Sequence, residues 1–278
     1  MNRWLTGAFA TCLFELRRSF SVQRTSVTLV LILFPPMMLS LIIGAAKFAN
    51  ARHPGSNGDT ALAQIMAATP FFIVFLVALV VLLTLLLWAT PNVYSELEGR
   101  SWGFIASRPG GRLSLYLGKY FAAVLVTTIV ATLALSASVY IADRMLSLPD
   151  PELLWRVLLG IFVLASIVYG AIFSMFGTLF YKRGMVVAAG YIVASEFFLS
   201  LVPAIINKLT MRYHLQELAI RGIGFFLPFE SESEYRFMYG LAWPIWGNLA
   251  MLLGAALVTL SIGGFAIVNR QYITSDES

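Results

Sequence analysis

The sequence predicts an all-α polytopic membrane protein, with six transmembrane helices preceded by an amphipathic helix in the membrane interface. Composition is the first reason, because 59% of the 278 residues are hydrophobic and only 12% are charged, against about 25% charged residues in soluble domains. Spacing is the second reason, because apolar runs near the ~20 residues that cross a bilayer core recur along the chain. We therefore interpret residues 1–278 as a single transmembrane domain.

The transmembrane helices are expected where these apolar runs lie. They cover approximately residues 27–46, 70–89, 120–142, 157–180, 185–206 and 243–268. Two of the connections are long. Residues 92–112 form a polar loop on the same side as the N-terminus, and residues 207–242 form an apolar outer loop in which helical spacing predicts short helices.

Residues 4–20 are too polar to cross a membrane but have the periodicity of a helix. Their apolar positions recur at steps of three and four residues and share one face: Trp4, Leu5, Ala8, Phe9, Cys12, Leu13, Leu16 and Phe20. Glu15, Arg17 and Arg18 fall largely off this face. The pattern is typical of a helix lying in the membrane interface; the alternative is a cytosolic helix packed on a partner.

The distribution of Lys and Arg places both termini in the cytosol. With the N-terminus inside, eleven of these cations lie in the cytosolic segments and eight lie on the other side, the bias that cytoplasmic loops show. Six crossings then return the C-terminus to the cytosol. The net charge of +5 favours the anionic cytoplasmic leaflet of the lipid bilayer as a partner, and we expect no nucleic-acid partner.

The stretch from Asn92 to Lys119 contains more functional groups than a connector between membrane helices needs. Its first part alternates charged and large apolar side chains, and we expect these to contact a cytosolic partner: Glu96, Glu98, Arg100, Trp102, Phe104, Ile105 and Arg108. Aromatic residues can fill an apolar groove, and charge pairs can set the register of the contact. The alternative is a surface loop with no partner.

Two features lie inside the predicted membrane helices. Glu196 is the only ionisable residue deep in an apolar run, where a carboxylate costs several kcal/mol unless it is paired or protonated. It could tie helices together, line a transport path or contact a lipid headgroup. The second feature is a row of small residues at four-residue spacing, typical of close helix packing: Ser166, Gly170, Ser174 and Thr178.

Several chemistries are excluded by what the sequence lacks. Cys12 is the single cysteine, so there is no intramolecular disulfide and no zinc-type Cys/His spacing. The phosphate-loop pattern is absent, since Gly118-Lys119 is followed by Tyr120 instead of Ser or Thr. We therefore expect no catalytic residue, no metal site and no cofactor in this chain. We likewise expect that the chain is not an enzyme and that any ATP would be hydrolysed by a separate chain.

The cytoplasmic stretch resembles the first cytoplasmic loop of permease subunits of type-2 ABC transporters. The resemblance rests on Glu96-Leu97-Glu98-Gly99, then Ser107-Arg108-Pro109, Arg112 and Gly118-Lys119. The pattern Tyr191, Glu196 and Pro203 in the fifth predicted helix is also similar to that family. Ser195 departs from it, because an aromatic residue is common at that position.

The resemblance implies a membrane-spanning permease subunit of an ATP-driven exporter in the bacterial inner (cytoplasmic) membrane. Two copies of the chain, or this chain and a related permease, would pair with two ABC ATP-binding subunits that carry ATP and Mg. The loop around residues 96–105 would be the coupling helix. One alternative is a scaffold or signalling subunit worked by an ABC ATPase without solute export. An ion-coupled secondary carrier is disfavoured, because it would need several intramembrane ionisable groups.

Overall fold

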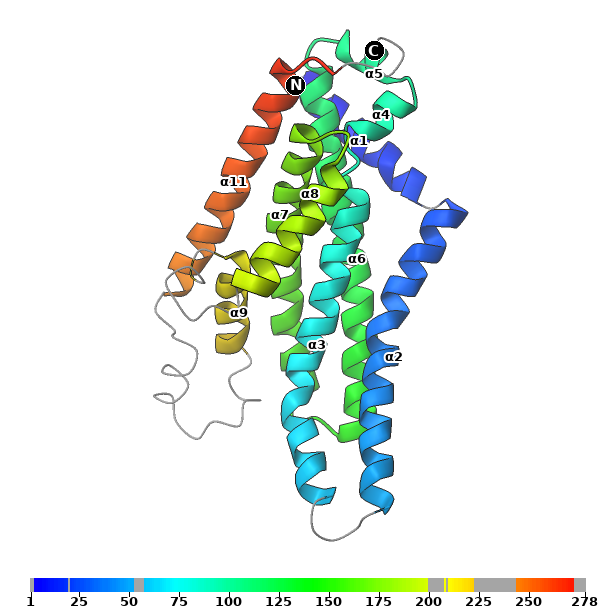
Figure 1. Ribbon diagram of the computed structural model, residues 1–278, viewed down its shortest axis with the longest axis vertical. Helices are drawn as coiled ribbons and strands as arrows, with labels where there is room; N and C mark the ends of the chain where they lie inside the picture. The colour runs from blue at the N-terminus through cyan, green and yellow to red at the C-terminus, as the bar shows by residue number, and fades with distance from the viewer. Residues whose placement is uncertain are drawn as a thin grey trace.

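The computed structural model describes residues 3–19, 21–52, 58–199, 208, 210–222 and 244–272. All regular structure in these ranges is helical (Figure 1), which confirms the all-α prediction for them. Five long helices form the body of the molecule: α2 (Val22–Arg52), α3 (Gly58–Trp88), α6 (Gly111–Leu146), α7 (Pro151–Leu179) and α11 (Ile245–Asn269).

Each long helix contains a segment that is long and apolar enough to cross a membrane, as expected for an integral membrane protein. Helices α6 and α7 form the centre, because 56% and 61% of their apolar segments are buried, against 22% for α2 and α11. Leu85, Leu135 and Leu158 are fully buried between α3, α6 and α7. The outward faces of α2 and α11 are apolar and exposed, as lipid-facing surfaces are.

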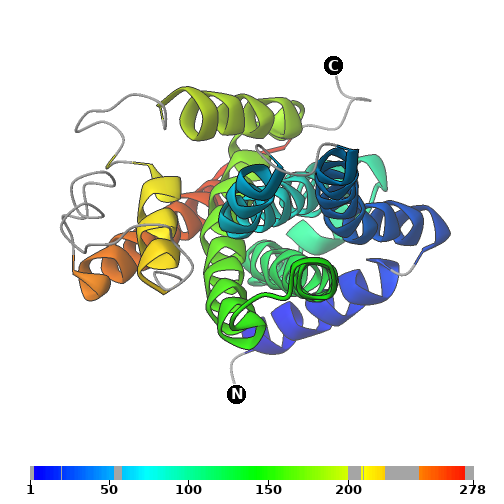
Figure 2. The same cartoon turned by 90° about the horizontal axis from the view of Figure 1, so that it is seen from below.

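The fifth predicted span, residues 185–206, differs from the other five. Its described part consists of α8 (Gly184–Tyr191) and a π-helical continuation, η1 (Ile192–Leu199). This segment is inclined to the long helices and lies on one side of the bundle (Figure 2). Residues 200–207 are outside the described ranges, so the structure contains five described helices of spanning length and one shorter apolar helix.

Small residues allow the closest approaches between the central helices. Lipid tails are as apolar as core side chains, so helices in a membrane associate through close packing. Ser166, Gly170, Ser174 and Thr178 are all buried on α7. A Cβ atom on Gly170 would lie 3.0 Å from Cγ2 of Val124 on α6.

Helix α1 (Arg3–Ser19) crosses α6 at the end of the bundle where the last described residues of the chain also lie (Figure 1). A Cβ atom on Gly118 of α6 would lie 2.6 Å from the backbone oxygen of Ala8, so only glycine permits this crossing. The predicted single apolar face is divided in two. Ala8 and Cys12 are buried, whereas Phe9 and Leu13 are exposed.

The prediction that Glu15 lies off the buried face of α1 is wrong. Glu15 continues the buried row of Ala8 and Cys12 at helical spacing and is only 8% exposed. Its burial is possible because a cation of α6 meets it there, as described below.

The segment predicted as the outer loop, residues 207–242, contains α9 (Met211–Gly222). Thr210 begins this helix by accepting a hydrogen bond from the backbone N–H of Tyr213 at 3.2 Å, the role of an N-cap residue. Helix α9 packs against α7 and α11. Residues 223–243 lie outside the described ranges.

Candidate functional site

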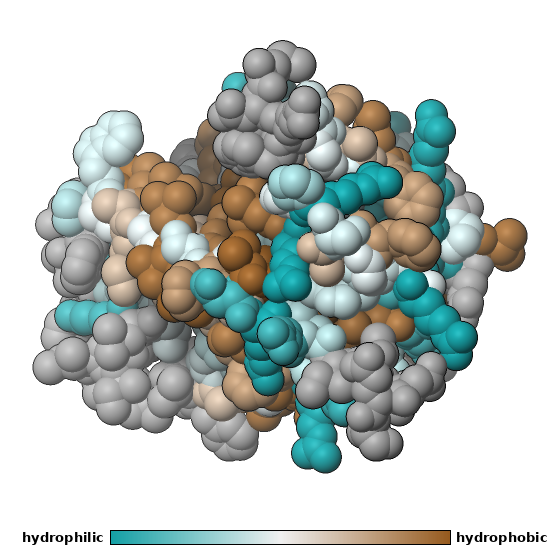
Figure 3. Space-filling model, turned by 90° about the horizontal axis from the view of Figure 1, so that it is seen from above, coloured by the Kyte–Doolittle hydropathy of each residue, from teal (hydrophilic) through white to brown (hydrophobic). Residues whose placement is uncertain are grey.

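Two short helices project from one end of the bundle, outside the apolar spans. They are α4 (Tyr94–Glu98) and α5 (Trp102–Ala106). Arg100 makes the turn between them with a φ of 54°, in the left-handed region. Gly110, with a φ of 72°, makes the turn that leads into α6. Hydrophilic side chains gather on this end of the molecule, with hydrophobic areas between them (Figure 3).

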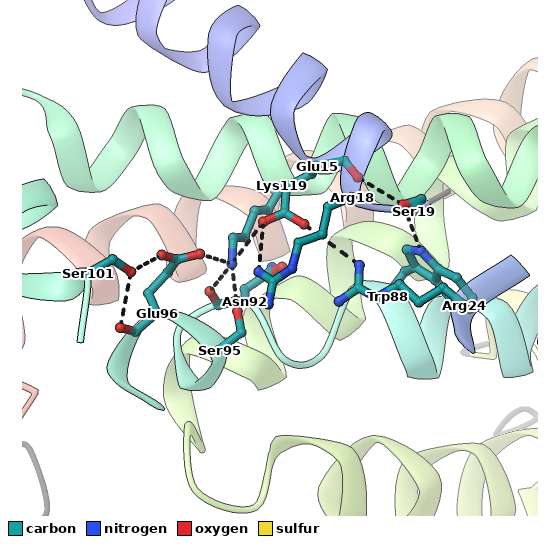
Figure 4. A network of polar contacts seen from close by, with 10 residues as sticks. All are labelled: Glu15, Arg18, Ser19, Arg24, Trp88, Asn92, Ser95, Glu96, Ser101 and Lys119. Atoms are coloured by element: carbon teal, nitrogen blue, oxygen red, sulfur yellow. Dashed lines mark hydrogen bonds and ion pairs between the residues drawn. The ribbon is translucent and has the colours of Figure 1, made fainter. Parts of the chain in front are cut away.

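The inner side of α4 is fixed by a buried ion pair (Figure 4). Nζ of Lys119, on α6, lies 2.6 Å from Oε1 of Glu96. The same ammonium donates hydrogen bonds to the Oγ of Ser95 at 2.7 Å and to the backbone oxygen of Asn92 at 3.0 Å. The three protons of the ammonium therefore all have acceptors in the segment that leads into and forms α4.

The other carboxylate oxygen of Glu96 accepts a short hydrogen bond from the Oγ of Ser101. Glu96 and Lys119 are 8% and 5% exposed, so a change to either would leave its partner charged and buried. Burial alone would raise the pKa of the Glu96 carboxyl. The charge and hydrogen bond of Lys119, together with the hydrogen bond from Ser101, outweigh this effect and hold the pKa below its usual value.

Helix α1 joins this network through Glu15 (Figure 4). Oε1 of Glu15 lies 3.4 Å from Nζ of Lys119, and the carboxylate is within 3.8 and 3.9 Å of Arg18 and Arg24. A pocket of about 20 Å³ lies beside it, lined also by Asn92. Both amide atoms of Asn92 and Oε1 of Glu15 are buried without a hydrogen-bond partner in the described chain, and the pocket is large enough for one water molecule.

The inner side of α5 is fixed by an aromatic cluster. Trp102 is 7% exposed and makes an edge-to-face contact with Tyr272, at a centroid distance of 5.0 Å. Tyr272 in turn donates a hydrogen bond from its hydroxyl to the backbone oxygen of Thr178 at 3.1 Å. The guanidinium of Arg112 lies 5.8 Å from the Trp102 ring centroid. Helix α5 is therefore attached to α6 and, through Tyr272, to the end of α7.

The seven residues predicted to contact a partner separate into two groups. Glu96 and Trp102 are buried and bind other residues of this chain, and Ile105 is half-buried. The other four are exposed: Glu98, Arg100, Phe104 and Arg108. Phe104 is the most exposed of the large apolar residues in this element, at 77%. The outer surface of α4–α5 thus carries exposed charged residues and two exposed aromatic residues, Phe104 and Tyr94, the latter at 44%.

Glu196, the predicted intramembrane acid, has its backbone in η1. Its side chain is outside the described part of the structure, so its role stays a prediction. Extended π-helices are rare and often occur at functional sites.

Lys119 and Glu15, which join α6 and α1 to this network, are not among the predicted site residues. From the sequence, Lys119 counts only as part of the Gly-Lys pair, and Glu15 is placed off the apolar face. A local signal existed for Glu15, because Ala8, Cys12 and Glu15 follow each other at steps of four and three residues. The pairing of Lys119 with Glu96 is not visible in local spacing.

Comparison with known proteins does not identify the family of this chain. No family model matches the sequence, and no curated protein matches it.

The Glu96–Lys119 pair predicts a defined response to acid. Because the folded-state pKa of Glu96 is lowered from its ordinary value of 4.5, its stabilising effect is complete above about pH 4.5 and is lost as the pH falls through the lowered pKa. We expect Glu96→Gln to lower the apparent melting temperature at pH 7, and expect this difference from the unmodified protein to shrink below pH 4.5. Thermal unfolding in detergent across pH 3.5–7 measures it. A difference that stays constant with pH would contradict the ion pair.

Proposed function

We propose that this chain is the membrane-spanning permease subunit of an ATP-driven exporter of the type-2 ABC class. The observation that carries the proposal is the outer surface of α4–α5, which lies outside the apolar spans. Phe104 is 77% exposed there, and Glu98, Arg100 and Arg108 of the same segment are exposed as well. Aromatic residues are enriched at the core of protein interfaces, and polar residues form the rim.

The proposed partner is an ABC ATP-binding subunit, which carries ATP and Mg. Phe104 would occupy an apolar groove of that subunit, and the charges around it would set the register. This division of labour follows from the absence of a phosphate loop in the sequence. A second copy of the permease, or a related one, completes the proposed assembly; the exposed apolar faces of α2 and α11 can face lipid or such a copy.

The inner contacts of α4 and α5 support a role in transmitting movement. A displacement of α4 would pull on α6 through Glu96 and Lys119, 2.6 Å apart. A displacement of α5 would act on the end of α7 through Trp102 and Tyr272. Rigid attachment to two central helices is what a coupling element needs, because a loosely held loop would absorb the movement of the ATPase.

Phe104→Ala tests this proposal. We expect it to weaken binding of the ATP-binding subunit by about 2 kcal/mol, or roughly 30-fold, without changing the melting temperature of the isolated permease. The affinity-tagged full chain is purified with the phosphate-loop ATPase that binds it, and affinity and ATP turnover are measured after reconstitution.

Phe9→Ala is the matched control, because Phe9 is similarly exposed, at 67%, but lies on α1. It should leave binding and turnover unchanged. If Phe104→Ala also leaves both unchanged, the assignment of this surface is wrong. Stimulation of ATP turnover by a transported compound would separate an exporter from a scaffold subunit.

A further inference from the structure

A second cavity lies between α3, α7 and α9, away from the α4–α5 surface. Its volume is about 300 Å³, at the lower end of the roughly 300–1,000 Å³ found for ligand sites. The walls are mainly apolar and include Phe75, Ala78, Leu82, Phe162 and Ala165. Such a wall favours a hydrocarbon chain over a polar solute.

The cavity lies alongside membrane-spanning segments. The residues that α3 and α7 contribute, within 74–82 and 161–169, fall well inside the apolar spans Ala68–Trp88 and Pro151–Leu179. These residues therefore lie at the depth of the lipid acyl chains. The stretch of α3 that lines the cavity is about 12 Å long, which matches part of an acyl chain.

The third wall, α9, is held firmly against the bundle. His214 is fully buried, with Nδ1 2.6 Å from Oδ1 of Asn248 on α11 and Nε2 2.9 Å from the backbone oxygen of Lys208. At the other end of α9, a Cβ atom on Gly222 would lie 2.3 Å from Cγ1 of Val157 on α7. Contacts at both ends make α9 a fixed wall of the cavity.

The charge at the cavity is positive. Among the described residues that line it, Arg212 is the only charged one, and Gln216 is its polar neighbour one turn later. The nearest acid on α9, Glu217, is 2% exposed and accepts a hydrogen bond from Arg221 at 2.8 Å. The carboxylate of Glu217 is thus paired with Arg221 within the helix, and Arg212 is one of the residues that line the cavity.

We propose that this cavity binds one acyl chain of an anionic membrane phospholipid, with the headgroup phosphate against Arg212. An arginine binds a phosphate through charge-assisted hydrogen bonds, and the apolar walls bind the chain. The site is independent of the proposed ATPase partner, since none of its residues belongs to α4 or α5.

The test uses the full chain in nanodiscs of phosphatidylcholine that contain phosphatidylglycerol with a photoreactive group in one acyl chain. We expect cross-links on residues 74–82 and 161–169. Ala165→Trp should fill the cavity and reduce these cross-links to the level of the exposed face of α2. Leu133→Trp is the control, because Leu133 is 49% exposed on α6 and does not line the cavity; it should leave them unchanged.

Arg212→Gln tests the headgroup. We expect it to lower the preference for phosphatidylglycerol over an equally labelled phosphatidylcholine by about fivefold, the effect of roughly one favourable charge contact. If Ala165→Trp does not fold, Ala78→Leu replaces it. Each of three results would overturn the proposal: cross-links that cavity filling does not change, equal labelling by both lipids, or occupation of the cavity by residues 200–207, 209 or 223–243 of the chain itself.

Discussion

Lys119→Met will destabilise the protein by about 3–5 kcal/mol, the cost of breaking a buried ion pair by removing one partner. Methionine keeps the length of the side chain but removes the charge. Glu96 and Glu15, both 8% exposed, are then left as two buried carboxylates that share no buried cation. The measurement is the apparent melting temperature and the yield of monodisperse protein in detergent.

Two further variants separate the ion pair from a general effect of losing a lysine. Lys182→Met removes an exposed lysine whose ammonium lies over the Tyr181 ring, and it should change stability by less than about 1 kcal/mol. Adding Glu96→Gln to Lys119→Met removes the carboxylate that has lost its ion-pair partner and should recover part of the loss. A Lys119→Met protein as stable as the Lys182→Met control would refute the buried network.

Trp102→Ala will also destabilise the protein, by about 3–5 kcal/mol, because it empties the space of a large buried side chain. The ring is 7% exposed and contacts Tyr272 edge-on at 5.0 Å. Its loss should free α5 while leaving the Glu96–Lys119 pair in place. Thermal unfolding measures the effect, and hydrogen exchange of α5 amides shows where the structure opens.

Phe104→Ala is the matched control for Trp102→Ala, because both replace an aromatic residue of the same five-residue helix. Phe104 is 77% exposed, so its removal should leave stability within about 0.5 kcal/mol of the original. The two variants thus divide the element into an inner side that supports the fold and an outer side that does not. Equal loss of stability in both would contradict this division.

The all-α class and the long apolar helices were predictable because the composition and length of an apolar run show whether the segment is suited to a bilayer or to water. The five helices of spanning length all overlap predicted spans. The ends were less predictable. The helix predicted at 120–142 begins at Gly111 and ends at Leu146 in the structure, because a helix can extend beyond the bilayer without any change in its local pattern.

The site was predictable only in part, for a related reason. Alternating charges and aromatic residues marked residues 96–108 as unusual, but they did not indicate which side chains face inward. The side chains that face inward, Glu96 and Trp102, contact Lys119 and Tyr272, which are distant from them in sequence. Hydrophobic periodicity predicts which face of a helix is buried, whereas tertiary packing decides which distant residue contacts that face.

The C-terminal residues Arg270 and Tyr272 have a consequence for how this end of the molecule opens. Arg270 donates a hydrogen bond to the last carbonyl of α7, at Leu179, and Tyr272 donates to Thr178. Arg112 donates from α6 to Val268 near the end of α11, at 2.9 Å. Cations are favourable at helix C-termini because they meet the negative end of the helix dipole. The ends of α6, α7 and α11 therefore form one cooperative unit, which should fray as a whole and not helix by helix.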